Sequence, residues 1–194
     1  MNTFIRILFM AFAMVLCSSS PAQEMFVPAH PAPKREVRGV WITTLGGLDW
    51  PKTKASSPQG MEQQKQELTE MLDQLQALRI NTIFLQTRVR GSVIYPSQIE
   101  PWDVALTGQY NRSPGYDPLA FAITEAHRRG MELHAWVVTI PCFKVAQAKR
   151  IGRKSLAYTH PSWLKKHADT YYLDPGLPEV AHYIADICQE IAEN

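Results

Sequence analysis

The feature that most constrains the fold is an alternation of strand-like and helix-like segments. Residues 37–44, 80–89 and 131–138 are short runs rich in apolar, β-branched and aromatic residues, as expected of buried parallel strands. Between them, residues 59–79 place apolar side chains at helical i, i+3 and i+4 spacing. Residues 118–129 follow a capping Asp and begin with Pro, as helices often do. The alternation therefore predicts an α/β fold with a parallel sheet and right-handed crossovers.

Two architectures fit this pattern: a doubly wound open sheet and the first part of a TIM (β/α)8 barrel. A nucleotide-binding open sheet would carry a Gly-rich phosphate loop after its first strand, and no such motif follows residue 44. The loops after the first two strands are instead long and rich in aromatic residues, as on the active face of a barrel. We therefore predict a partial TIM barrel of about three β/α units. The basic stretch after Pro141 has no regular pattern, and residues 179–193 form a last helix.

The N-terminal residues have the composition of a signal peptide. A short basic segment, residues 1–6, precedes an apolar run at residues 7–17. That run is too short for a membrane span, which needs roughly 20 apolar residues. Small residues at positions 18–22 then supply a cleavage site. We predict a signal peptide over residues 1–22, cleaved after Ala22.

The predicted signal peptide determines the expected location and domain boundaries. Residues 23–35 contain three prolines and form a Pro-rich linker, which leaves residues 36–194 for the barrel part. We expect the protein to be secreted or periplasmic. Lipidation at Cys17 is the less favoured alternative, because Leu16 is a poor match to the small residue expected before a lipidated cysteine.

Charge and cysteine content exclude several classes of function. Lys and Arg number 20 against 18 Asp and Glu, so we expect neither nucleic acid nor an anionic membrane as a partner. The local basic run at residues 149–154 is interpreted as a solvated surface loop. No C-x-x-C pair or close His/Cys cluster is present, so we predict no metal and no cofactor. Of the cysteines beyond the signal peptide, Cys188 is expected on the apolar face of the last helix.

Polar and aromatic residues at or near the predicted strands form the candidate site. Polar hydrogen-bonding groups suit sugar hydroxyls, and aromatic rings suit the C–H faces of a sugar. The alternative is that the tryptophans belong to the core and the polar residues are structural. The predicted substrate-binding residues are Trp41, Asp49, Trp50, Gln86, Arg88, His134 and Trp136.

Ten short motifs, in order along the chain, resemble glycosyl hydrolase-like family 10. They are V-R-G-V-W-I-T-T with L-D-W-P (37–44, 48–51), N-T-I-F-L-Q-T-R-V (81–89), Y-P-S (95–97), E-P-W (100–102), L-T-G (106–108), P-G-Y-D-P-L-A-F (114–121), E-A-H-R-R-G (125–130), E-L-H-A-W (132–136), H-P-S-W-L (160–164) and Y-L-D-P-G (172–176). The resemblance implies an exported TIM-barrel glycoside hydrolase that hydrolyses O-glycosidic bonds. Its implied substrate is a cell-envelope or extracellular polysaccharide, with the glycan of peptidoglycan as one candidate.

The chain departs from the family pattern in two places. Val137 to Pro141 replaces the Asn-Pro-aromatic sequence with which many members continue the third strand. The chain also stops at Asn194, before the Asp-rich strand that follows in the family. We therefore expect only the N-terminal part of the barrel, and the catalytic residues stay unknown.

A second class of function is left open. Glycoside hydrolysis needs two carboxyl groups, and most acidic residues of this chain fall on predicted helix surfaces or in turns. The alternative is a non-catalytic carbohydrate-binding or scaffold protein. Such a protein would self-associate through the open edges of its incomplete barrel, or dock on a partner that covers them.

Overall fold

The computed structural model describes residues 36–193. The chain divides into two units, Met1–Glu36 and Val37–Asn194, and the second is described below. The predicted signal peptide of residues 1–22, its cleavage after Ala22, the alternative lipidation at Cys17 and the linker of residues 23–35 lie outside the described residues.

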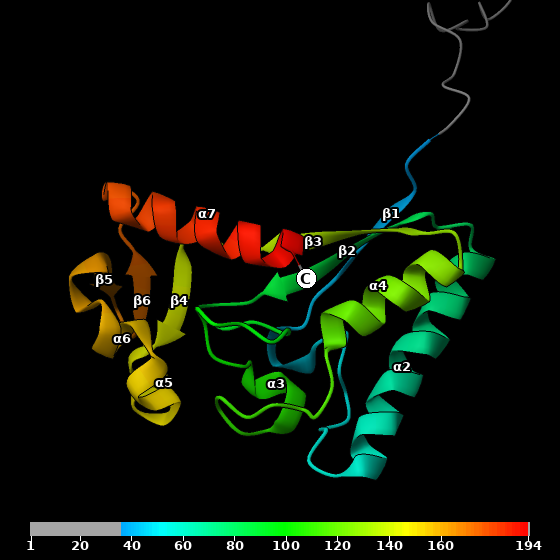
Figure 1. Cartoon of the computed structure of the whole chain (residues 1–194), viewed down its shortest axis with the longest axis horizontal. Helices are drawn as coiled ribbons and strands as arrows, with labels where there is room; N and C mark the ends of the chain where they lie inside the picture. Colours follow the sequence, from blue (N-terminus) through cyan, green and yellow to red (C-terminus); the bar gives the residue numbers. More distant parts are fainter. Residues whose placement is uncertain (1–35, 194) are drawn as a thin grey trace, which may run out of the picture. The chain divides into compact units, whose positions relative to one another are not determined.

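A parallel sheet of three strands forms the first part of this unit (Figure 1). Its order is β1-β2-β3, with Trp41 beside Phe84 and Phe84 beside His134 in the register. Two long helices connect the strands, as predicted, although each strand is shorter than its apolar run. The elements are β1 (Gly39–Ile42), α2 (Pro58–Ala77), β2 (Thr82–Arg88), α4 (Pro118–Arg128) and β3 (Glu132–Val137).

Both crossover helices begin at side-chain caps. The Ser57 hydroxyl accepts a hydrogen bond from the Gly60 amide before α2. The Asp117 carboxylate accepts bonds from the Leu119 and Ala120 amides before α4, and Pro118 occupies the first turn of that helix. These caps satisfy amides that have no partner within the helix, so the sequence itself fixes where each crossover starts.

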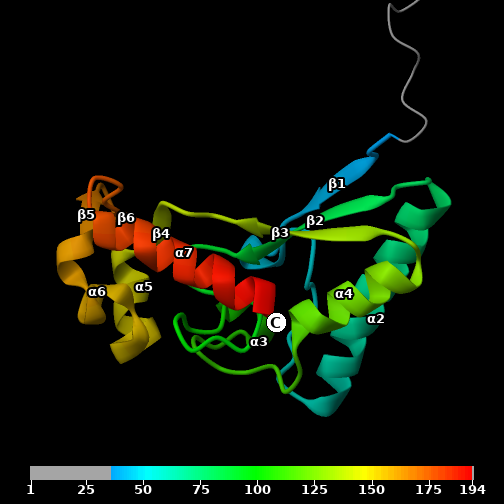
Figure 2. The same cartoon turned by 45° about the horizontal axis from the view of Figure 1, so that its top comes forward.

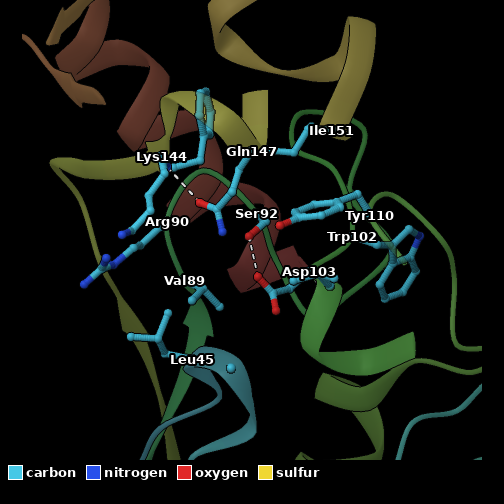
Figure 3. Close-up of a pocket in the computed structure, with 13 residues that line it drawn as sticks. Leu45, Val89, Arg90, Ser92, Trp102, Asp103, Tyr110, Lys144, Gln147 and Ile151 are labelled. Carbon is cyan, nitrogen blue, oxygen red and sulfur yellow. Dashed lines mark hydrogen bonds between the residues drawn. The ribbon is translucent and has the colours of Figure 1, made fainter. Parts of the chain in front are cut away.

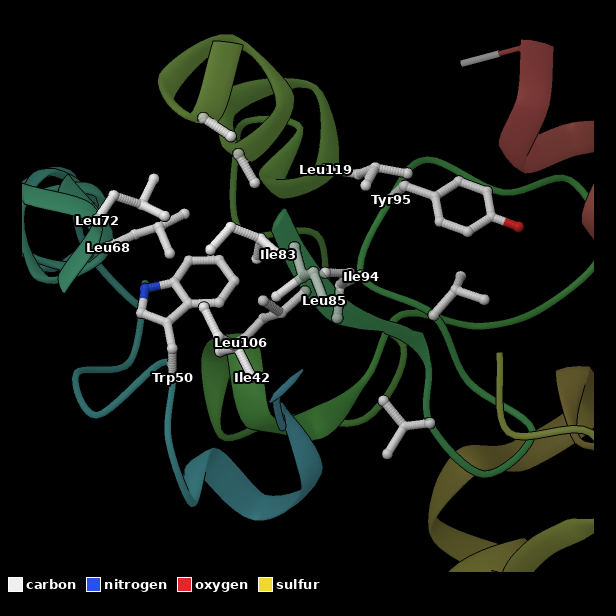
Figure 4. Packing of buried hydrophobic residues seen from close by; sticks show 14 of the residues in the cluster. Ile42, Trp50, Leu68, Leu72, Ile83, Leu85, Ile94, Tyr95, Leu106 and Leu119 are labelled. Atoms are coloured by element: carbon white, nitrogen blue, oxygen red, sulfur yellow. The ribbon is translucent and has the colours of Figure 1, made fainter. Parts of the chain in front are cut away.

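One face of the parallel sheet packs on α2 and α4. Ile42, Ile83 and Leu85 point to this side and are buried against helix residues such as Leu68 and Leu72 (Figure 4). The strands and helices that form this cluster alternate along the chain, as expected of β/α units whose helices cover the outer face of the sheet. This core holds the strand ends in place.

The opposite face of the sheet is not covered by any described element. Trp41 is 58% exposed there, and its ring stacks on Phe84 at 4.7 Å between ring centroids. Trp136 meets Trp41 edge-on at 5.1 Å, and His134 lies 5.3 Å from the Phe84 ring. The result is an exposed aromatic layer, which we call the open sheet face.

The chain after β3 has more regular structure than the sequence pattern predicts. The stretch interpreted as irregular contains an antiparallel sheet of order β4-β6-β5 with short helices around it, and α7 follows. Each of these strands has four residues, which is too short to show a clear hydrophobic period. The elements are β4 (Pro141–Lys144), α5 (Val145–Ile151), η2 (Gly152–Lys154), α6 (Leu156–Thr159), η3 (Pro161–Trp163), β5 (Leu164–His167), β6 (Thr170–Leu173) and α7 (Pro178–Glu193).

The last helix joins the two sheets. Val180 and Ile187 of α7 are buried in the core of the antiparallel part, while Ile191 also packs against the parallel part. Figure 2 shows α7 running from the antiparallel sheet toward the parallel one. Cys188 is exposed, which corrects its predicted position on the apolar face. No helix within residues 36–193 is long and apolar enough to cross a membrane.

Candidate functional site

A cavity of about 250 Å³ opens where the parallel strands end (Figure 3). Its walls come from the turn η1 (Leu45–Gly47) after β1, the segment after β2, the short helix α3 (Val104–Thr107), and β4 with α5. In open and closed parallel sheets, ligands bind at the carboxyl ends of the strands. We call this cavity the strand-end pocket.

A tight turn after β2 shapes one wall of the strand-end pocket. The Val89 amide donates to the Ser92 carbonyl at 2.8 Å, and Gly91 between them has a φ of 74°. A side chain at Gly91 would be strained there, and its Cβ would also press against the Phe143 ring at 3.2 Å. The turn therefore places Ser92 in the lining and brings β4 close to the end of β2.

Asp103 is the only carboxylate among the lining residues, and it is 7% exposed. Its Oδ2 accepts from the Ser92 hydroxyl at 2.6 Å, and its Oδ1 accepts from the Ala105 amide at 2.7 Å as the cap of α3. Burial raises the pKa of Asp103, although both hydrogen bonds and the charge of Lys54 act in the other direction. The group thus holds its proton to higher pH than an exposed aspartate.

Aromatic and cationic side chains surround this carboxyl. In Figure 3, Trp102 and Tyr110 lie on one side of Asp103, and Arg90 and Lys144 extend on the other. Arg150 sits over the Tyr110 ring, 4.8 Å from its centroid, and holds the ring at the rim. Flat aromatic surface beside directional polar groups is the combination that a sugar ring requires.

Arg88, a predicted substrate contact, is fully buried. Its guanidinium bonds both oxygens of Glu100, with 2.6 Å between Nη2 and Oε1, and it also donates to the carbonyls of Val138 and Thr139. Tyr183 of α7 donates to the same Glu100 at 2.6 Å. Every polar group here is bonded within the protein, so Arg88 has no free donor for a sugar.

Tyr183 stays a hydrogen-bond donor because of its surroundings. Burial, and then the negative charge of Glu100, hold the pKa of Tyr183 well above its ordinary value. The phenol therefore keeps its proton and binds Glu100. Together Arg88, Glu100 and Tyr183 form what we call the buried triad, which joins β2 and the segment after it to α7.

Two more of the predicted residues organise the turn after β1. The Gln86 side-chain oxygen accepts from the Thr44 and Leu45 amides, each at 3.0 Å, and Gln86 is 3% exposed. The Asp49 carboxylate accepts from the Thr43 amide at 2.8 Å and remains exposed. Both side chains therefore hold the loop that forms the pocket wall, and only Asp49 is accessible to a ligand.

The three predicted tryptophans and histidine separate into two locations, neither of which is the strand-end pocket. Trp50 is fully buried in the core, and its indole N–H donates to the Gln64 carbonyl at 2.9 Å. Trp41, His134 and Trp136 lie together on the open sheet face. The structure thus brings these last three together but gives Trp50 no surface for a substrate.

Several residues that line the strand-end pocket were not predicted from the sequence, and they come from loops and short elements. Ser92, Asp103 and Gln147 have no strand periodicity that would mark them. The aromatic content of the segment after β2, which includes Trp102 and Tyr110, is the one signal that pointed toward this pocket. Within the described part of the chain, no group of three or more His, Cys, Asp or Glu side chains is placed to hold a metal ion.

Two named relatives share sequence with most of this chain. Glycosyl hydrolase DigH of Escherichia coli strain K12 is 36% identical over 204 residues, which cover 93% of this chain and 46% of that protein. Glycosyl hydrolase YngK of Bacillus subtilis strain 168 is 34% identical over 164 residues, which cover 82% of this chain and 31% of that protein. The chain therefore spans less than half the length of these curated relatives.

Solved structures of two TIM-barrel glycosidases share the fold. A maltogenic α-amylase, AmyB from Thermotoga neapolitana, superposes with a TM-score of 0.52 at 15% identity, over 81% of this chain and 36% of that chain. A GH20 exo β-N-acetylglucosaminidase from Vibrio harveyi, solved in complex with N-acetylglucosamine, superposes with a TM-score of 0.51 at 16% identity. The superposition covers 84% of this chain and 26% of that chain. At such low identity the likeness concerns the fold alone.

A match to a family model covers the whole chain beyond residue 35. The model of the glycosyl hydrolase-like 10 family matches residues 36–194, which include all of the described residues. The chain belongs to the glycosyl hydrolase-like 10 family.

Proposed function

We propose that the chain is the N-terminal part of a glycoside hydrolase barrel and that its strand-end pocket binds one sugar unit of a polysaccharide. The consecutive order β1-β2-β3, with both crossover helices on one face, is the geometry of the first units of a (β/α)8 barrel. The same three strands would also begin an open sheet. The likeness to two TIM-barrel glycosidases is what favours the barrel.

The observation that carries this proposal is the composition of the strand-end pocket. Trp102 and Tyr110 offer ring faces, while Ser92, Gln147 and Asp103 offer hydrogen-bonding groups within one cavity. Its volume of about 250 Å³ is below the roughly 300–1,000 Å³ of sites for drug-sized ligands. The pocket therefore suits a single sugar ring of a chain that continues outside it.

Hydrolysis requires more than this pocket contains. Glycosidases use two carboxyl groups about 5 to 9.5 Å apart, and Asp103 has no second carboxylate beside it in the pocket lining. The raised pKa of Asp103 suits a proton donor, but a partner must come from elsewhere. In the proposal, the catalytic pair of the complete enzyme includes residues beyond those described here.

The single pocket carboxylate is also the observation that favours a second candidate function. On that alternative the chain is a non-catalytic carbohydrate-binding or scaffold protein, and it self-associates through the unpaired outer edges of β1 and β3. Light scattering of the full chain distinguishes a monomer from a self-associated form. The location proposed for either function is secreted or periplasmic, and the substrate is a cell-envelope or extracellular polysaccharide such as the peptidoglycan glycan.

One experiment separates the two functions. The complete protein that the proposal calls for, in which this chain forms the N-terminal part, is incubated with an N-acetylglucosamine tetrasaccharide, and both binding and new reducing ends are measured. Release of reducing ends that is lost in Asp103→Asn supports the hydrolase. Binding without any release supports the carbohydrate-binding protein, and the absence of both contradicts the proposal.

A further inference from the structure

Positive charge is concentrated in one stretch of a nearly neutral chain. Between Glu132 and Asp169 there is no Asp or Glu. The same stretch contains seven Lys and Arg residues, namely Lys144, Lys165, Lys166 and the run of Lys149, Arg150, Arg153 and Lys154. A solvated loop explains a few cations, but it does not explain why every acidic residue is absent.

The end of this basic run lines a second cavity, of about 370 Å³. We call it the basic cavity. Arg153 and Lys154 of η2 and His160, just after α6, contribute to its walls, together with the segment 98–100 and Tyr183 of α7. Glu100 is the one carboxylate in this lining, and it is already bonded to Arg88 and Tyr183. The basic cavity therefore presents cations without a free anion.

The two cations of η2 are available to a ligand. Among residues 36–193, no carboxylate lies within ion-pair distance of Arg153 or Lys154, and both side chains are exposed. Other lysines of the same stretch do have partners, such as Lys144 with Asp169 at 3.0 Å. Lys149, Arg150 and Lys166 also have no carboxylate within ion-pair distance among residues 36–193, but of these unpaired cations only Arg153 and Lys154 line the basic cavity.

His160 is held in a fixed orientation at the wall of this cavity. Its ring stacks on Trp163 with 3.8 Å between centroids and 20° between planes. Its Nδ1 lies 3.0 Å from the Thr159 hydroxyl, and within the described chain Nε2 has no hydrogen-bond partner. A fixed imidazole nitrogen beside a guanidinium and an ammonium is an arrangement that can recognise a planar anion.

We propose that the basic cavity is a subsite for the carboxylate of an acidic sugar, bound by Arg153, Lys154 and His160. An arginine fork matches the two oxygens of a carboxylate, and lysine adds a point charge. One segment, residues 144–160, lines both this cavity and the strand-end pocket, so a polymer bound in the pocket can extend along it. The inference rests on the proposed function and adds to it a preference for acidic polysaccharides.

The test compares matched ligands on matched variants of the full chain. The probes are a galacturonate trisaccharide and its carboxyl-reduced neutral form, and their dissociation constants are measured by titration calorimetry at low and physiological salt. The wild type should bind the acidic probe at least about tenfold more tightly, as expected for the loss of a charge-assisted bond. Arg153→Gln/Lys154→Gln should lose that preference, whereas Lys149→Gln/Lys166→Gln, which removes equal charge outside both cavities, should keep it.

Three outcomes overturn the inference. The first is equal affinity of the wild type for the two probes, and the second is an equal loss in both double variants. The third is that a thymidine oligonucleotide of matched charge binds as tightly as the acidic saccharide and is weakened by the same variants. This would show recognition of any polyanion. Binding of the neutral N-acetylglucosamine tetrasaccharide is measured in parallel. If it persists while the acidic preference is absent, only this inference fails, and if no saccharide binds, the proposed function fails too.

Discussion

The parallel and antiparallel parts of this chain are stabilised in different ways. In the parallel part, the strands Thr82–Arg88 and Glu132–Val137 pack on two long helices through one continuous apolar core. In the antiparallel part, four-residue strands and short helices form a smaller core, and only α7 is long. Polar contacts also join the two parts, and the buried triad is one of them. We infer that the core between the parallel sheet and its helices forms without the antiparallel part. The strand-end pocket, in contrast, is lined by residues of both parts.

The second polar contact between the two parts is centred on Glu190 of α7. Its carboxylate accepts hydrogen bonds from the Tyr95 hydroxyl at 2.9 Å, the Ser97 hydroxyl at 2.5 Å and the Gln98 amide at 2.7 Å. The motifs Y-P-S and E-P-W, which contributed to the family resemblance, thus supply partners to α7. Polar contacts of this kind are directional, and they therefore fix the register between the parts more tightly than apolar packing alone.

The largest effect is expected from removing the carboxylate of the buried triad. Glu100→Ala leaves the Arg88 guanidinium buried without its counter-ion, which costs about 3 to 5 kcal/mol in the free energy of unfolding. Arg88→Met/Glu100→Leu should be markedly more stable than the single variant, because it removes both charges. Urea denaturation measures all three proteins. A Glu100→Ala variant as stable as the wild type would contradict the role given to the triad.

A smaller effect is expected from deleting single hydroxyls at the same junction. Tyr183→Phe removes a hydrogen bond to the charged Glu100, and Tyr95→Phe removes one to Glu190. Each should lower the free energy of unfolding by about 1.5 to 3 kcal/mol, since the acceptor is ionised. Relative to the wild type, amide hydrogen exchange should accelerate more in α7 than in α2 for both variants. Equal acceleration in both helices would mean that the two parts are a single cooperative unit.

The smallest change in stability is expected at Asp103. Asn caps a helix as well as Asp, so Asp103→Asn should change the free energy of unfolding by less than about 1 kcal/mol at neutral pH. Because the folded-state pKa of Asp103 is raised, its contribution to stability is fully present below the ordinary aspartate pKa and is lost as pH rises through the folded value. The variant should therefore gain stability relative to the wild type between pH 4 and pH 7. A relative loss over that range would show that the buried charge is stabilising.

The sequence predicts the parallel part well because burial imposes a clear pattern on it. The three strands and the helices on both sides of β2 were found from apolar periodicity and, for the second helix, from the cap at Asp117. The antiparallel part escaped because a strand of four residues, such as Thr170–Leu173, is shorter than the window in which alternation can be recognised.

The candidate site was harder to predict than the fold. Arg88 and Gln86 are polar residues at a strand end, and the sequence contains no indication that Glu100 and the Thr44 amide satisfy them inside the protein. Trp50 is part of the core for a similar reason, since its indole N–H finds the Gln64 carbonyl. Polar residues in strands predict a location near the site, but their partners decide whether they face a ligand.

The five tryptophans allow one direct test of where a sugar binds. They report on four places: Trp102 on the strand-end pocket, Trp50 on the core, Trp163 beside the basic cavity, and Trp41 together with Trp136 on the open sheet face. Their assigned indole N–H signals in a ¹⁵N NMR spectrum of the full chain are followed during titration with the N-acetylglucosamine tetrasaccharide. We expect the Trp102 signal to shift in a saturable way while the Trp50 signal stays in place. A shift confined to Trp41 and Trp136 would contradict the assignment of the site to the strand-end pocket.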